Sequence, residues 1–92
     1  MTDARKILTK QIESAYIQIH CCKARLSELD DRIRRESMDA WKMVGHLEGA
    51  SIGCHATNII SLGTEMARVC ADLQSAQDYK RNAESTLEML NG

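Results

Sequence analysis

The segment 45–53, with the sequence GHLEGASIG, decides the fold of this chain. Three of its nine residues are glycine, and glycine inside a helix costs roughly 1 kcal/mol relative to alanine. The rest of the 92-residue chain contains no proline and few aromatic residues, a composition that favours long helices. The segment is therefore the weakest helical stretch, and we expect a turn there between two helices.

On the N-terminal side of this segment, apolar residues recur in alternating steps of three and four. Ten of the eleven positions in this first seam are apolar or Cys, and the exception is Glu36. The first seam consists of Leu8, Ile12, Ala15, Ile19, Cys22, Leu26, Leu29, Ile33, Glu36, Ala40 and Met43. Spacing of this kind places one continuous apolar stripe along a helix, as in a coiled coil.

A second seam follows the segment, with nine of ten positions apolar and Lys80 as the exception. It consists of Ile59, Leu62, Met66, Val69, Leu73, Ala76, Lys80, Ala83, Leu87 and Leu90. Continuing the first seam would place core positions at 54, 57 and 61, which the second seam does not use. The offset matches neither a three-residue nor a four-residue insertion, so a single uninterrupted helix does not fit the pattern.

We therefore predict an all-α fold, an antiparallel two-helix hairpin resembling a coiled coil, as a single domain over residues 1–92. The expected elements are a helix over about 3–44, a turn over about 45–52 and a helix over about 52–90. Ser51 is the expected N-cap of the second helix.

The register of the hairpin follows from a turn centred near residue 48. Lys80 then lies opposite Tyr16, where a cation–π contact is possible. Glu36 lies opposite Ile60, without a counter-charge. We expect Glu36 to mark either a place where the seam opens to water or a place where a partner approaches.

The second helix carries a further stripe of mostly small residues beside its seam. This stripe consists of Gly53, Ala56, Ile60, Gly63, Ala67, Cys70 and Gln74. Two adjacent faces imply two neighbours, so we predict a homodimer that forms a four-helix bundle. The expected dimer interface consists of Ala56, Ile60, Gly63, Ala67 and Cys70. The alternative is an exposed face that is tolerated because its side chains are small.

Large apolar residues also lie off the seam of the first helix. Tyr16, Ile17, Met38 and Trp41 are of the kind that anchors protein interfaces, and with Glu36 they form the expected partner-binding set. Trp41 could instead cover the glycine-rich turn.

The formal net charge of −1 does not favour a nucleic-acid binder. Arg32, Arg34 and Arg35 form the only basic run, and carboxylates four residues away can pair with them. Nucleic-acid regulation through these arginines is therefore the alternative function, beside a structural role in a coiled-coil assembly. We expect no membrane span, because the longest uncharged stretch, 49–64, contains many polar and glycine residues. The start of the chain has no apolar signal core, so we expect a cytoplasmic protein.

The four cysteines are expected to be reduced thiols in that compartment, although a Cys21–Cys70 disulfide is conceivable. His20-Cys21-Cys22 and Cys54-His55 lack the spacing of a zinc site, so no metal or other cofactor is expected.

No catalytic motif occurs in the sequence, and we expect no enzyme. The predicted function is a protein–protein interaction module that acts as an adaptor, chaperone or inhibitor through its helical surface. An inhibitor of a host machine, carried by a phage or mobile element, would fit the small size.

Overall fold

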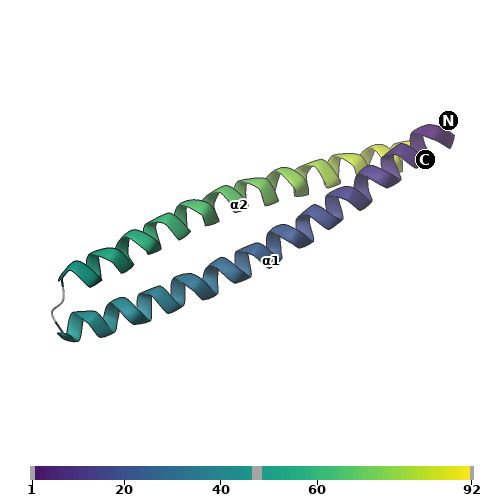
Figure 1. Ribbon diagram of the computed structural model, residues 1–92. Coiled ribbons are helices and arrows are strands. Elements are labelled where there is room, and N and C mark those ends of the chain that lie inside the picture. The colour runs from purple at the N-terminus through teal and green to yellow at the C-terminus, as the bar shows by residue number, and fades with distance from the viewer. Residues whose placement is uncertain (1, 47–48, 92) are drawn as a thin grey trace. The chain divides into compact units, whose positions relative to one another are not determined.

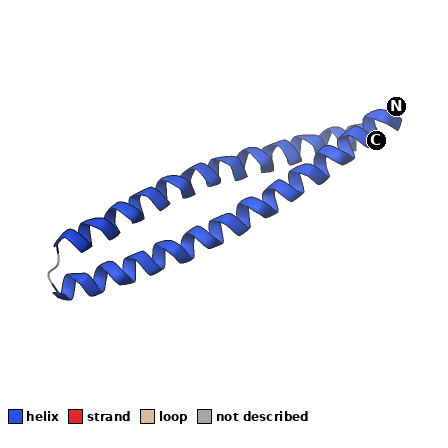
Figure 2. Ribbon diagram, in the orientation of Figure 1, coloured by secondary structure: helices blue, strands red, loops and turns tan. Residues whose placement is uncertain are grey.

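The computed structural model describes residues 2–46 and 49–91, and these residues form two helices (Figure 1). Helix α1 spans Thr2–His46 and helix α2 spans Gly49–Asn91. No strand occurs in either described range (Figure 2). The two helices pack against each other as a hairpin, so the all-α fold class predicted from the two seams is confirmed.

The packing divides into two units. The terminal unit contains Met1–Lys23 and Cys70–Gly92, and the central unit contains Ala24–Val69. In the terminal unit, the Arg5 guanidinium donates to the backbone carbonyl of Leu90 at 3.1 Å. In the central unit, Arg25 pairs with Glu65 across the two helices. Within each unit, early residues of α1 thus meet late residues of α2, so the helices are antiparallel.

The seams predicted from the sequence form the core of both units. Every position of the first seam is buried or half-buried, and in the second seam only Leu90 is exposed. The fully or nearly buried side chains are Leu29, Leu62 and Val69 in the central unit and Ala15, Ala76 and Ala83 in the terminal unit. Because alanine buries little apolar area, the core of the terminal unit is the thinner of the two.

The expected turn over 45–52 was too long. Helix α1 continues through Gly45 to His46, and α2 already begins at Gly49. Ser51 is therefore inside α2, and its expected role as the N-cap is wrong; the remaining turn residues, 47 and 48, lie outside the described residues. The low helix propensity of glycine is a weak determinant that tertiary packing overrides. Ile52, in the first turn of α2, is half-buried, so packing contributes to the helix from its start.

Candidate interaction surfaces

The stripe of small residues on α2 is exposed along its whole length. Each residue of the predicted dimer interface (Ala56, Ile60, Gly63, Ala67 and Cys70) is solvent-exposed in the single chain, and Ile60 is 69% exposed. A Cβ built on Gly63 would meet no atom within 4 Å. Nothing in the chain itself therefore requires glycine at position 63, and the face is open to a neighbour.

A second exposed patch, the Trp41 patch, consists of Met38, Trp41 and Val44 on α1 in the central unit. Trp41 is 78% exposed and Met38 is 62% exposed. The two side chains are three residues apart, which places them on adjacent turns of one helix face. Little of the Trp41 surface is covered by the described residues, and the turn residues 47 and 48, which bear on the alternative that Trp41 covers the turn, lie outside them. The patch is accessible for contact with another molecule.

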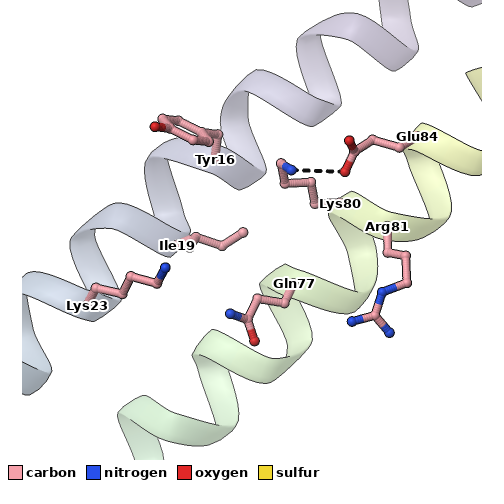
Figure 3. Close-up of a pocket in the computed structure, with 7 residues that line it drawn as sticks. All are labelled: Tyr16, Ile19, Lys23, Gln77, Lys80, Arg81 and Glu84. Carbon is pink, nitrogen blue, oxygen red and sulfur yellow. Dashed lines mark hydrogen bonds and ion pairs between the residues drawn. The ribbon is translucent and has the colours of Figure 1, made fainter.

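Tyr16 and Ile17 lie on α1 in the terminal unit, and each is 63% exposed. They line an open groove of about 390 Å³ together with Ile12, Glu13 and Lys80. A neighbouring groove of similar size shares Tyr16 and Lys80 and continues over Lys23, Arg81 and other polar residues (Figure 3). The predicted proximity of Tyr16 and Lys80 is therefore confirmed.

The predicted cation–π contact between these two residues is not formed. The Lys80 ammonium instead donates to Glu84 Oε1 at 2.9 Å, one turn further along α2 (Figure 3). A carboxylate within hydrogen-bond distance is a stronger partner for an ammonium than the face of a phenol ring. Tyr16 thus keeps an accessible ring.

Glu36 has a counter-group, contrary to the expectation that it faces Ile60 alone. His55 Nδ1 lies 2.6 Å from Glu36 Oε2, and Asn58 Nδ2 donates to Glu36 Oε1 at 3.4 Å. The hydrogen bond from His55 lowers the pKa of Glu36, with smaller contributions in the same direction from Asn58 and Arg32. The Glu36 carboxylate is engaged within the hairpin. Internal pairing therefore explains its place in the seam better than contact with a partner protein does.

An ion pair between the helices was not anticipated from the sequence. Arg25 pairs with Glu65 across the hairpin and with Glu28 at 3.1 Å along α1. The hydrogen bond that the Arg25 guanidinium donates to the Glu65 carboxylate lowers the pKa of Glu65 and raises the pKa of Arg25. Arg25 precedes the seam residue Leu26 and Glu65 precedes Met66, and residues that flank a seam are the usual places for interhelical pairs. The position of Arg25 and Glu65 beside the two seams was therefore the feature of the sequence from which this ion pair could have been predicted.

The arginine run lies among acceptors and acidic groups, although only Arg34 forms an ion pair with a described carboxylate. Arg34 forms the expected ion pair with Asp30 at 3.1 Å. Arg35 Nε donates to the backbone carbonyl of Asp31 at 3.5 Å rather than pairing with a carboxylate. Arg32 lies beside Glu36 and Glu65 and lowers the pKa of both. The structure thus surrounds Arg32, Arg34 and Arg35 with acceptors and acidic groups that oppose phosphate binding.

The thiol and imidazole groups are dispersed. Cys21, Cys22, Cys54 and Cys70 are all free, and Cys22 is the only one that is half-buried. Across residues 2–46 and 49–91, no three His, Cys, Asp or Glu side chains are grouped so that they could hold a metal ion. Neither helix has a stretch, within those ranges, that is long and apolar enough to cross a membrane.

Comparisons of the chain with protein-family models, with curated proteins and with solved structures found no match.

Proposed function

We propose that this chain is a non-enzymatic interaction module that pairs with a second copy of itself and presents helical surface to another protein. The observation that carries the proposal is the distribution of large apolar side chains. Among the described residues, ten large apolar side chains are exposed, including those of Trp41, Ile60, Tyr16 and Ile17, whereas only that of Leu29 is fully buried. Exposed apolar groups gathered into patches are typical of binding surfaces.

The surface area of the single chain supports the same proposal. A compact monomer of this mass is expected to expose about 5,400 Å². The chain exposes 6783 Å². The excess is about 1,400 Å², whereas each partner in a standard protein interface buries about 800 Å². The chain therefore exposes more surface than a compact monomer of its mass, which leaves area available for contact with a second copy.

The stripe of small residues on α2 is the face proposed for the copy. A two-fold contact uses the same patch on both chains, so the patch must be able to pack against a second copy of itself. Ala56, Gly63 and Ala67 leave room for the backbone of an opposing α2, and Ile60 offers a large apolar group near the centre. The product would be a four-helix bundle with the seams inside and the two stripes at its middle.

The Trp41 patch is the face proposed for a different protein. Tryptophan is enriched among the residues that contribute most to binding energy, and Met38 beside it adapts to irregular surfaces. Adaptors, chaperones and inhibitors all act in this way, by covering a surface of the partner or by filling a groove in it. We place this activity in the cytoplasm, where the four cysteines would be reduced thiols. Cell fractionation that recovers the protein with oxidised, paired cysteines would contradict that placement.

The proposal is tested by two measurements on the full chain. Sedimentation equilibrium across micromolar concentrations should show a monomer–dimer transition, and a species that stays monomeric throughout would remove the self-association. Affinity capture from the native host, read by mass spectrometry, should recover a protein that is lost with Trp41→Ala and retained with Tyr79→Ala. Tyr79 is a suitable control because it is also exposed but lies in the terminal unit, away from the Trp41 patch. Equal recovery with both variants would refute the assignment of the patch.

A further inference from the structure

The cations of the terminal unit are gathered on one surface, which we call the basic groove surface. Three adjoining grooves make up this surface. The central groove shares Glu13 with one neighbouring groove and shares Tyr16 and Lys80 with the other. Every lysine and arginine of the terminal unit lines one of these grooves: Arg5, Lys6, Lys10, Lys23, Lys80 and Arg81.

The carboxylates of the terminal unit are mostly elsewhere. Only Glu13 and Glu84 line the three grooves, so the surface has six cations, two anions and a formal charge of +4. The terminal unit as a whole has six basic and six acidic side chains and is neutral. The segregation of charge is therefore a property of the fold and does not appear in the composition.

Several of these cations have no counter-charge within the chain. Lys6, Lys10 and Lys23 form no hydrogen bond or ion pair with any described residue. Lys80 is bound to Glu84, and Arg81 forms a loose, exposed pair with Asp78 at 3.7 Å. Pairs of this exposed kind contribute little to stability, so an incoming carboxylate can compete for the Arg81 guanidinium.

An apolar strip lies in the middle of the basic groove surface. Ile12, Tyr16 and Ile17 line the central groove of about 390 Å³, between Lys10 on one side along α1 and Lys23 on the other. Tyr16 and Ile17 are each 63% exposed, so they offer apolar area that an additional apolar neighbour would remove from water.

Five of the α1 residues that line the grooves follow one another lengthwise along one helix face. They extend from Arg5 through Thr9, Ile12 and Tyr16 to Lys23, in steps of three or four with one step of seven. The separation of eighteen residues from Arg5 to Lys23 corresponds to about 27 Å along the helix axis, which is the length of a partner helix of about 18 residues. A third helix that packs along a two-helix hairpin needs such a lengthwise apolar strip with polar margins.

We propose that the basic groove surface binds an acidic amphipathic helix of a partner protein. Large apolar side chains of that helix fill the groove beside Tyr16 and Ile17, and its carboxylates meet Lys10, Lys23 and Arg81. This inference rests on the proposed function as an interaction module, and it names a partner chemistry and a surface distinct from the Trp41 patch. Charge complementarity fixes the partner's orientation and raises the association rate, while the apolar contacts supply most of the affinity.

The test begins with a displayed library of random peptides of helical length, panned against the full-length protein. We expect the enriched peptides to be net acidic and to repeat apolar residues in steps of three and four. Enrichment of peptides without an acidic bias would overturn the proposal. Because panning always yields a ranked population, the bias can be measured whatever the natural partner is.

A synthetic copy of the most enriched peptide is then titrated against matched variants by fluorescence anisotropy. The double variant Lys10→Glu/Lys23→Glu should weaken binding at least ten-fold, and Lys42→Glu, a charge reversal in the central unit, should leave it unchanged. Tyr16→Ala should weaken binding, whereas Tyr79→Ala, an equally large truncation on a different groove, should not. Circular dichroism checks that all variants keep their helix content. Equal affinities for the double variant and the wild-type chain would overturn the assignment.

Two other anionic partners are distinguished in the same assay. If the protein binds phosphatidylserine vesicles or a DNA oligonucleotide more tightly than the enriched peptide, and Lys10→Glu/Lys23→Glu abolishes that binding, the surface is a membrane or nucleic-acid site and the proposal is wrong. Failure of this inference is separable from failure of the proposed function, because the self-association on α2 and the Trp41-dependent capture do not involve these residues.

Discussion

Replacing Gly63 with alanine tests the packing of α2 and the proposed dimer face at once. Gly63 lies within α2, and a Cβ at this position has open space within 4 Å. In the isolated hairpin the substitution therefore only removes the conformational cost of glycine in a helix. We expect the free energy of unfolding to rise by about 0.8–1.0 kcal/mol. For a domain of this size, 1 kcal/mol corresponds to a Tm increase of about 4–8 °C.

The same methyl group has the opposite effect on self-association. If a second α2 packs with its backbone against Gly63, the added carbon overpacks a contact that occurs twice in the symmetric dimer. Overpacking of a close contact costs about 1–3 kcal/mol. Each 1.4 kcal/mol is a factor of about ten in Kd, so each overpacked contact is expected to raise the dimer Kd several-fold to about a hundred-fold.

The assay separates the two effects by concentration. Urea unfolding followed by circular dichroism is performed where sedimentation shows only monomer, and sedimentation equilibrium then measures the dimer Kd. The control is Gly45→Ala, which also has open space at its Cβ but lies on α1, away from the stripe. It should not change the Kd. If the Gly63→Ala monomer were less stable than the wild type, the claim that a Cβ at position 63 has open space would be wrong. If the Kd were unchanged, the assignment of the dimer interface to the stripe around Gly63 would be wrong.

Three further perturbations follow from burial and pairing. Leu29→Ala should reduce the free energy of unfolding by about 3 kcal/mol because the side chain is fully buried, whereas Leu90→Ala, 40% exposed, should cost under about 1 kcal/mol; equal losses in urea unfolding would contradict the core assignment. Trp41→Ala should change stability by no more than about 0.5 kcal/mol, measured by thermal unfolding, since the side chain is 78% exposed. The pKa values of Glu36 and Glu65 are lowered in the folded chain, so the folded state binds fewer protons than the unfolded state in acid. Stability should therefore be constant above the ordinary glutamate pKa of about 4.3 and fall below it, and Glu36→Gln should flatten this fall in urea titrations at stepped pH.

The seams were predictable because burial in a helical hairpin has a strict period. Each half-buried or buried position of α1 from Leu8 to Met43 falls on the alternating steps of three and four, apart from a few flanking residues such as Arg25. A slip of one residue would rotate these side chains out of the core, so the pattern must be present in any sequence that folds in this way.

The pairing across the hairpin was predictable only to about one helical turn. Glu36 was expected to face Ile60, but its partners are His55 and Asn58. Two heptad seams remain in contact after one slides along the other by a turn, so the apolar pattern alone leaves several registers of similar energy. Polar pairs can distinguish such registers, and the register of the central unit is one that joins Arg25 to Glu65 and Glu36 to His55.

The exposed surfaces were partly predictable for a related reason. Tyr16, Ile17, Met38 and Trp41 lie off the seam in the sequence, and all four are exposed in the structure. The basic groove surface was not predictable, because its lining combines α1 residues such as Lys23 with Lys80 and Arg81 of α2. Only the register of the hairpin brings these charges together.

The fold itself does not require the residues on which the proposed contacts depend. The hairpin would form with any polar residue at Tyr16, Ile17 or Trp41, since none of these side chains contributes to the buried seam. Alanine occupies the buried positions of the terminal unit, while larger apolar groups stand outside them in water. A sequence that served the hairpin alone would gain stability by exchanging the two sets. The present distribution is the one expected if another molecule covers this surface, as the proposed function requires.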